Sequence, residues 1–140
     1  MILKIRLYAL VVVLLLTPIG FYTKFYNGPG YNWVNSYAGD IFYPMFWFFV
    51  LIFLKPRMSP IKSAVIIFIF STLIEFSQLV SFPLLEKIRD TFIGRTVFGV
   101  RFVAVDIVYY AVGCLLAIGL YNLLHLFGFP VPLSKPERHN

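Results

Sequence analysis

Charged residues are scarce in this sequence. Its 140 residues include only six acids, and charged side chains make up 13% of the chain, about half the share that is usual in soluble domains. Apolar residues make up 60%, so the composition excludes an ordinary soluble fold and predicts one domain in lipid. The net charge of +6 fits loops rich in Lys and Arg beside a membrane, and we expect no nucleic acid partner.

Cysteine, histidine and the common catalytic patterns are also scarce. The single cysteine, Cys114, lies in an apolar run and cannot form an internal disulfide, so we expect it to act as a small packing residue. The two histidines, His125 and His139, show no metal-ligand spacing. A serine–histidine–acid set and a glycine-rich phosphate loop are both missing. The sequence therefore predicts no metal and no cofactor, and it favours a protein that is not an enzyme.

What the sequence does contain is four long apolar runs. A helix of ~20 residues crosses the ~30 Å hydrocarbon core of a bilayer, and the runs predict spans at 3–22, 38–54, 61–81 and 102–124. The first run has no cleavage pattern after it, so we expect an uncleaved span, kinked in its last turn by Pro18. We predict a single transmembrane domain over 1–126 and a disordered cytoplasmic tail over 127–140.

Two connections between these runs have compositions typical of the membrane interface. The first loop has a predicted turn at 27–30 and then a segment rich in Tyr and Trp, which suit the interface. The third loop carries an apolar stripe from Leu84 to Phe92, which predicts a short interfacial helix ended by Gly94 and a turn-rich stretch over 95–100. The predicted fold is an all-α bundle of four transmembrane helices with interfacial segments in loops 1 and 3.

The acids and the third loop predict a polar cluster. A carboxylate in hydrocarbon is costly and rarely lacks a partner. The spans alternate in direction across the membrane. One leaflet therefore holds Asp40 at the start of the second span, Glu75 late in the third and Asp106 about one turn inside the fourth. The same leaflet meets the basic third loop. We predict a ligand site built from these residues: Asp40, Glu75, Gln78, Asp106, Arg89, Arg95 and Arg101.

Small and polar residues follow Asp106 at helical spacing. Tyr110 and Gly113 lie on its side of the fourth span, and Ala117 comes next. Small residues of this kind allow two membrane helices to approach closely. We therefore expect a tight helix contact at Gly113 and Ala117.

The orientation follows from the distribution of Lys and Arg, which collect on the cytoplasmic side of membranes. The predicted termini and second loop hold more of them than the first and third loops do, so we expect an inner-membrane protein with both termini in the cytoplasm. The two sets are Lys4, Arg6, Lys55, Arg57, Lys62, Lys135 and Arg138 against Lys24, Lys87, Arg89, Arg95 and Arg101.

The polar positions also carry a family resemblance. They are the run Asn-Gly-Pro-Gly-Tyr-Asn-Trp-Val-Asn at 27–35, Glu75-Phe-Ser-Gln78, Arg89 to Thr96, Gly99, Phe102, Asp106, Tyr110 and Gly113. Over about residues 20–125 the chain resembles an uncharacterised bacterial membrane family, domain of unknown function 2809. It is more loosely similar to the VanZ-like group, one of whose members is implicated in teicoplanin resistance. The resemblance implies handling of an amphiphile or envelope lipid, and it carries over Glu75, Gln78, Arg89, Arg95 and Asp106.

Three functions remain open on the sequence. The leading one is a small inner-membrane protein that binds an amphiphilic or anionic envelope ligand, since arginines suit phosphate and carboxylate groups. The second is an accessory subunit of a larger membrane complex, with the cluster serving as structural ion pairs. The third is a membrane enzyme that uses Glu75 as an acid or base. Membrane lipids are expected partners in each case.

Overall fold

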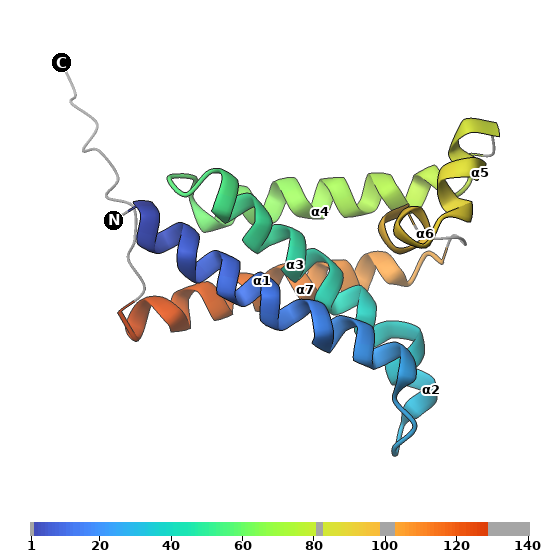
Figure 1. The fold of residues 1–140 in the computed structure, drawn as a ribbon, viewed down its shortest axis with the longest axis horizontal. Helices are drawn as coiled ribbons and strands as arrows, with labels where there is room; N and C mark the ends of the chain where they lie inside the picture. Colours follow the sequence, from blue (N-terminus) through green and yellow to red (C-terminus); the bar gives the residue numbers. More distant parts are fainter. Residues whose placement is uncertain (1, 81–82, 99–102, 129–140) are drawn as a thin grey trace.

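The computed structural model describes residues 2–80, 83–98 and 103–128. Helices account for nearly all of this part of the chain, and it contains no strand. In chain order they are α1 (Ile2–Phe25), α2 (Tyr31–Trp33), the π-helix η1 (Val34–Ala38), α3 (Gly39–Leu54), α4 (Pro60–Ser77), α5 (Pro83–Asp90), α6 (Phe92–Phe98) and α7 (Asp106–Leu126). Figure 1 shows the four long helices running along the molecule, with α5 and α6 together at one end.

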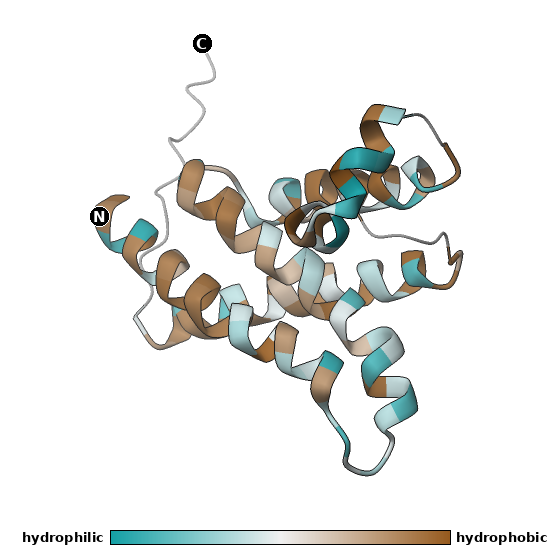
Figure 2. Cartoon of the chain, turned by 45° about the vertical axis from the view of Figure 1, so that its right-hand side comes forward, coloured by the Kyte–Doolittle hydropathy of each residue, from teal (hydrophilic) through white to brown (hydrophobic). Residues whose placement is uncertain are grey.

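Four stretches are long and apolar enough to cross a membrane: Ile2–Phe25, Tyr31–Leu54, Pro60–Ser77 and Asp106–Leu126. Only 17% to 33% of the most apolar window of each stretch is buried inside the bundle, so most of these side chains face outward. Soluble proteins rarely expose so much apolar surface, and Figure 2 shows it as brown along the long helices. The prediction of an all-α bundle of four membrane-length helices is confirmed.

Helix α3 is the central element, since it contacts α1, α4 and α7. Its Phe48 is fully buried in the apolar core. At Gly113 of α7, an added Cβ would lie 2.3 Å from the carbonyl oxygen of Ile41 and 2.5 Å from Cγ of Pro44. Ala117, one turn further on, is also fully buried. The close helix contact expected at Gly113 and Ala117 is confirmed, and it joins α7 to α3.

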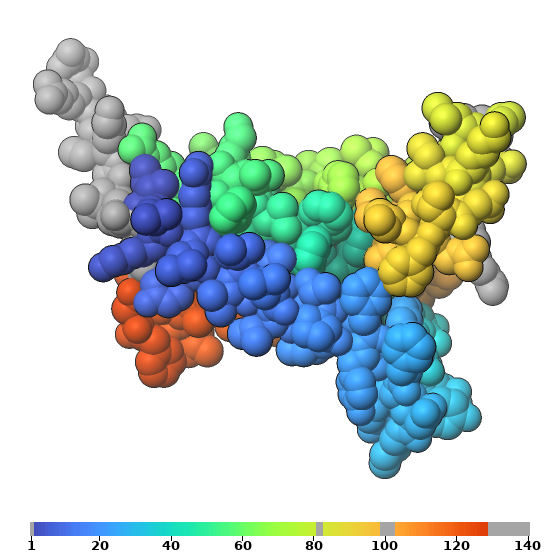
Figure 3. Space-filling model, viewed as in Figure 1, coloured from blue at the N-terminus to red at the C-terminus, as the bar shows by residue number. Residues whose placement is uncertain are grey.

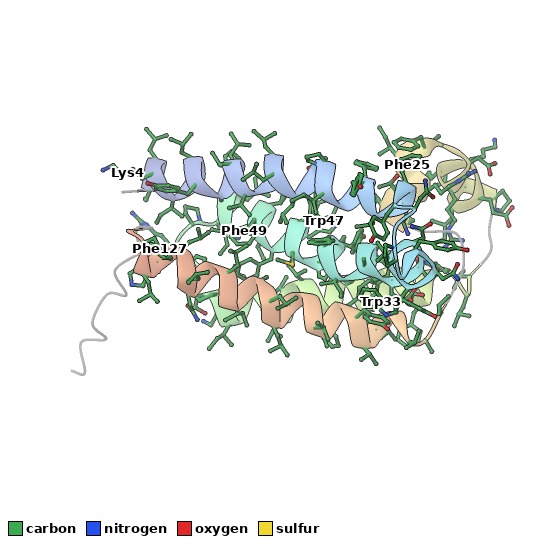
Figure 4. All side chains as sticks on the ribbon, turned by 90° about the horizontal axis from the view of Figure 1, so that it is seen from below. Lys4, Phe25, Trp33, Trp47, Phe49 and Phe127 are labelled. Atoms are coloured by element: carbon green, nitrogen blue, oxygen red, sulfur yellow. The ribbon has the colours of Figure 1, made fainter. Side chains whose placement is uncertain are left out.

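The connecting helices share one end of the bundle. Figure 4 shows Lys4 and Phe127 at one end and Phe25 and Trp33 at the other, with Trp47 between them. Helices α2, α5 and α6 lie at the end that holds Phe25 (Figure 1). We call this the loop end and the opposite one the N-terminal end. The arrangement is the one expected from four spans of alternating direction.

The first connection differs from the sequence prediction. Helix α1 continues to Phe25, so Pro18 lies well inside it and not in its last turn. The predicted interfacial segment of loop 1 is not separate, because α2 and η1 run without a break into α3. The reason is local hydrogen bonding: Gly30 turns the chain at φ +73°, and its carbonyl oxygen accepts from the backbone of Trp33 and Val34. The side-chain amide of Asn35 then donates to the carbonyls of residues 23 and 26, which ties this segment to the end of α1.

The predicted ends of the third span and of the short helix in loop 3 also need correction. Helix α4 ends at Ser77 and not at residue 81. The guanidinium of Arg89 donates a 2.7 Å hydrogen bond to the carbonyl oxygen of Ser77, and the backbone hydrogen bonds of residues 78–80 join residues three apart. Gly94 does not end the loop-3 helix. Two short helices meet at Thr91, and Gly94 lies buried inside the second, where an added Cβ would clash with the carbonyl of Ile88.

The fourth predicted span begins too early. Asp106 is the first residue of α7 and not one turn inside it. An acid in the first turn of a helix is favoured by the helix dipole, whereas Asp40 lies inside the continuous helical stretch formed by α2, η1 and α3. The stretch over 95–100 that was predicted to be turn-rich is helical as far as Phe98, the end of α6. Residues 99–102, which include Arg101, and residues 129–140 of the predicted tail lie outside the described residues.

Candidate functional site

A cavity of about 680 Å³ opens among α1, α3, α4, α6 and α7 at the loop end. Much of its wall is aromatic: Phe21, Phe25, Phe42, Phe46, Trp47, Phe92 and Phe98. Its polar side chains are Thr17, Lys24, Asp40, Tyr43, Glu75, Gln78, Arg95, Thr96, Asp106 and Tyr110. The volume is within the range of small-molecule pockets, which are also mostly apolar with a few placed polar groups. Figure 3 shows the yellow atoms of α5 and α6 beside the light-blue end of α1 on one face of the molecule.

Glu75 is held firmly in the wall of this cavity. Its side chain is only 1% exposed. Oε1 accepts a 2.7 Å hydrogen bond from the backbone N–H of Val103, and Oε2 accepts a 2.8 Å bond from the hydroxyl of Tyr110. A buried carboxylate with both oxygens bonded is stabilised in place. Glu75 therefore ties α4 to the start of α7.

Asp40 and Asp106 form the second part of the site. Both side chains line the cavity, from the first residues of α3 and α7. The ammonium group of Lys24 is close enough to attract both carboxylates, and it also donates a 3.1 Å hydrogen bond to the carbonyl of Asn35. Oδ2 of Asp40 is buried without a hydrogen-bond partner among the described residues. Unlike Glu75, this pair therefore includes a carboxylate oxygen that accepts no hydrogen bond from the described residues.

Side chains from two long helices hold α6 over the cavity. The hydroxyl of Tyr43 donates to the carbonyl of Val97 at 2.6 Å, and Nε2 of Gln78 donates to the carbonyl of Phe98 at 2.8 Å. The last carbonyls of a helix have no partner within it, so these two bonds satisfy the C-terminus of α6. At its other end, Oγ1 of Thr91 accepts from the backbone N–H of Gly94 at 3.0 Å, as an N-cap residue does.

The predicted arginines separate into different environments. Arg89 donates to the carbonyl oxygens of Ser77 and Val80 and therefore caps the end of α4. Arg95 lines the cavity together with the acids. Arg101 lies outside the described residues. The structure thus brings Asp40, Glu75, Gln78, Asp106 and Arg95 to one cavity and places Arg89 beside the helix end.

Sequence reasoning did not assign to the site five polar residues that line the cavity: Thr17, Lys24, Tyr43, Thr96 and Tyr110. Tyr110 comes four residues after Asp106 and Tyr43 three after Asp40, and helical neighbours at this spacing share a face. That spacing was the available signal, and it identifies both tyrosines. Lys24 gave no such signal, because it comes from the end of α1 and reaches the acids only through the packing of α1 on η1 and α3.

Metal binding has no support in the described part of the chain, where no three His, Cys, Asp or Glu residues are grouped as an ion would require. Aromatic side chains in the cavity lining offer contacts to apolar groups, and its charged and amide side chains offer hydrogen bonds to polar ones.

The fold and the cavity define a class: a small all-α protein with four membrane-length helices and a mostly apolar pocket that also contains charged side chains. The chain belongs to the family described as protein of unknown function (DUF2809), whose model matches residues 30–114, more than half of the sequence. The match runs from the turn before α2 to the middle of α7, so it contains every predicted site residue but not α1 or Lys24. No solved structure matches the chain.

Proposed function

We propose that this protein binds an amphiphilic envelope ligand in the cavity at the loop end, with the polar head among the acids and Arg95. The observation that carries the proposal is one space of about 680 Å³ whose lining is mostly apolar and aromatic and also contains acids, Lys24 and Arg95. A cavity that served only to pack helices would be filled by side chains, because protein interiors are close-packed.

The charged and amide side chains of the cavity indicate which chemical groups the head of the ligand would carry. Lys24 and Arg95 offer donors to an anionic group such as a phosphate or carboxylate. Oδ2 of Asp40 and Oε1 of Gln78 are acceptors for which the described chain supplies no donor. An amphiphile with both an anionic group and a hydroxyl or amine would complement this set.

The location follows from the same proposal. We place the protein in a bacterial inner membrane, with the loop end facing outward and the N-terminal end in the cytoplasm. The excess of Lys and Arg in the terminal segments and the second loop supports this orientation. The ligand would then enter from the outer leaflet.

A variant that fills the cavity tests the proposal directly. Gly20 lines the cavity, and an added Cβ there would meet only Cβ of Phe42, at 3.9 Å. Gly20→Leu should therefore place an isobutyl group in the cavity without a clash at Cβ. We expect a bound lipid or other amphiphile on gently purified wild-type protein by native mass spectrometry, and its loss from Gly20→Leu and from Arg95→Ala.

Two matched controls make this test specific. Gly119→Leu makes the same change in α7 at a site where an added Cβ meets nothing within 4 Å. Lys87→Ala removes a positive charge from exposed α5 surface that does not line the cavity. Both should keep the adduct. If wild type carries no defined adduct, or if the controls lose it as readily as Gly20→Leu does, the proposal is wrong.

One observation favours a second candidate, an accessory subunit in which the cluster is structural. Both carboxylate oxygens of Glu75 are already bonded within the chain. In that case Gly20→Leu and wild type should both lack a small-molecule adduct, and a partner protein should copurify with each of them.

A further inference from the structure

A second hollow lies at the N-terminal end, opposite the cavity. Its volume is about 590 Å³, and it lies between the first turns of α1, the α3–α4 connection and the start of α4. Four basic side chains line it: Arg6, Lys55, Arg57 and Lys62. Among the described residues no acid lines it, so these side chains give it a positive field.

Local structure holds these groups around the hollow. The backbone N–H of Met58 donates to the carbonyl of Lys55, which turns the connection. Pro56 is buried and anchors that turn. Ser59 then caps α4 by accepting a 3.3 Å hydrogen bond from the N–H of Lys62. The start of α4, with its partial positive charge, therefore lies in the wall of the hollow and adds to the basic side chains.

Topology alone does not explain this arrangement. Basic residues anywhere at one end of a membrane protein set its orientation, and Lys4 does so at this end without lining the hollow. The four hollow-lining residues come from two segments far apart in sequence, 6 and 55–62, yet they surround one space. Beside them are large apolar side chains that are open to the surroundings: Leu3, Leu54 and Ile61 are 79%, 61% and 67% exposed.

We infer that this hollow binds the phosphate group of an anionic phospholipid, with the acyl chains lying along Leu3, Leu54 and Ile61. Basic pockets between membrane helices recognise anionic head groups in this way. Both halves of the ligand are then matched: the phosphodiester by Arg6, Lys55, Arg57 and Lys62, and the chains by the exposed apolar side chains next to them. The inference does not depend on the ligand proposed for the loop end.

The test uses the full-length protein in detergent, titrated by native mass spectrometry with three probes: phosphatidylglycerol, phosphatidylcholine and inorganic phosphate. Removing one basic group near an anionic lipid should weaken binding about fivefold. We therefore expect Arg57→Gln and Arg6→Gln each to lower the apparent affinity for phosphatidylglycerol about fivefold. Lys4→Gln, which removes the same charge from α1 outside the hollow, should leave it unchanged.

Several outcomes would overturn the inference. Equal binding of phosphatidylglycerol and phosphatidylcholine would show that no anionic head group is recognised. An equal loss with Lys4→Gln would show diffuse attraction in place of a site. Binding of inorganic phosphate without phosphatidylglycerol would reject a lipid source. If Arg57→Gln does not fold, Arg6→Gln and Lys62→Gln decide the matter. Gly20→Leu should keep this lipid even if it loses the loop-end ligand, which separates the two proposals.

Discussion

The hydroxyl of Tyr110 donates a 2.8 Å hydrogen bond to Oε2 of Glu75, across the contact between α7 and α4. Tyr110 is 5% exposed and Glu75 is 1% exposed. The bond therefore lies inside the bundle, in the wall of the cavity at the loop end. It joins two helices that come from opposite sides of the α5–α6 segment in sequence.

This bond should show energetic coupling between the two residues. Tyr110→Phe should destabilise the protein by about 1 kcal/mol, the usual size of a polar contact between membrane helices. Glu75→Ala should cost more, about 2–4 kcal/mol, because it leaves the donors of Tyr110 and Val103 unpaired. A double-mutant cycle measured by denaturation in mixed micelles should give an interaction energy of about 1 kcal/mol.

The control for this cycle is Tyr22→Phe, since Tyr22 is 64% exposed. That change should be neutral and should add to Glu75→Ala without coupling. Strict additivity between Tyr110→Phe and Glu75→Ala would contradict the bond as a stabilising contact.

Gly113 should tolerate no larger side chain. A Cβ at this position would overlap the carbonyl of Ile41 and the ring of Pro44, and both atoms belong to the rigid backbone or ring of α3. Gly113→Ala should therefore force α3 and α7 apart and destabilise the bundle by about 1–3 kcal/mol. Thermal unfolding in detergent measures this change.

Gly119→Ala in the same helix is the matched control, since an added methyl group there meets nothing within 4 Å. Alanine also favours a helix more than glycine does, by about 0.5–1 kcal/mol, so this variant should be neutral or more stable. Equal melting temperatures for the two variants would mean that α3 and α7 do not meet at Gly113.

Helix α6 should loosen when its two C-terminal hydrogen bonds are removed. Tyr43→Phe deletes the donor to Val97, and Gln78→Leu deletes the donor to Phe98. A loss of about 1 kcal/mol of local stability raises the equilibrium constant for local opening about fivefold. Hydrogen–deuterium exchange should therefore rise about fivefold over Phe92–Phe98 and stay unchanged over Asp106–Leu126. A uniform rise across both helices would point to global unfolding instead.

Arg89 should stabilise the end of α4 and not the ligand. Arg89→Ala removes the donors to Ser77 and Val80, so hydrogen–deuterium exchange should increase near residues 78–80. Lys87→Ala, on the exposed surface of the same helix α5, should leave that exchange rate unchanged. Loss of a ligand adduct from Arg89→Ala without faster exchange at this helix end would contradict the assignment.

The two ends of the bundle should be accessible from opposite sides of the membrane. In a Cys114→Ala background, Leu3→Cys reports on the N-terminal end and Asn32→Cys on the loop end, and both positions are exposed. A membrane-impermeant maleimide added to intact cells should label only one of them. With the orientation proposed above, the labelled position is 32. Labelling of both or neither in intact cells, with full labelling after permeabilisation, would contradict the single span between them and the ends assigned here.

The sequence by itself determined the membrane class and the approximate positions of the four helices, because each depends on runs of apolar residues that no tertiary contact can change. It also indicated that Asp40, Glu75, Gln78 and Asp106 fall near one end, since alternation of spans follows from connectivity alone. The tight contact at Gly113 was predictable for the same kind of reason: small residues at helical spacing permit close approach.

Only the tertiary structure decided how the polar groups are paired. Arg89 has the charge expected of a partner for the acids, yet the end of α4 lies nearer and its carbonyls take the guanidinium. Glu75 finds its donors in Tyr110 and in a backbone N–H, and Lys24 reaches Asp40 from another helix. Hydrogen bonds are short-ranged and directional, so their partners depend on packing within an ångström, which residue type and spacing along the chain do not specify.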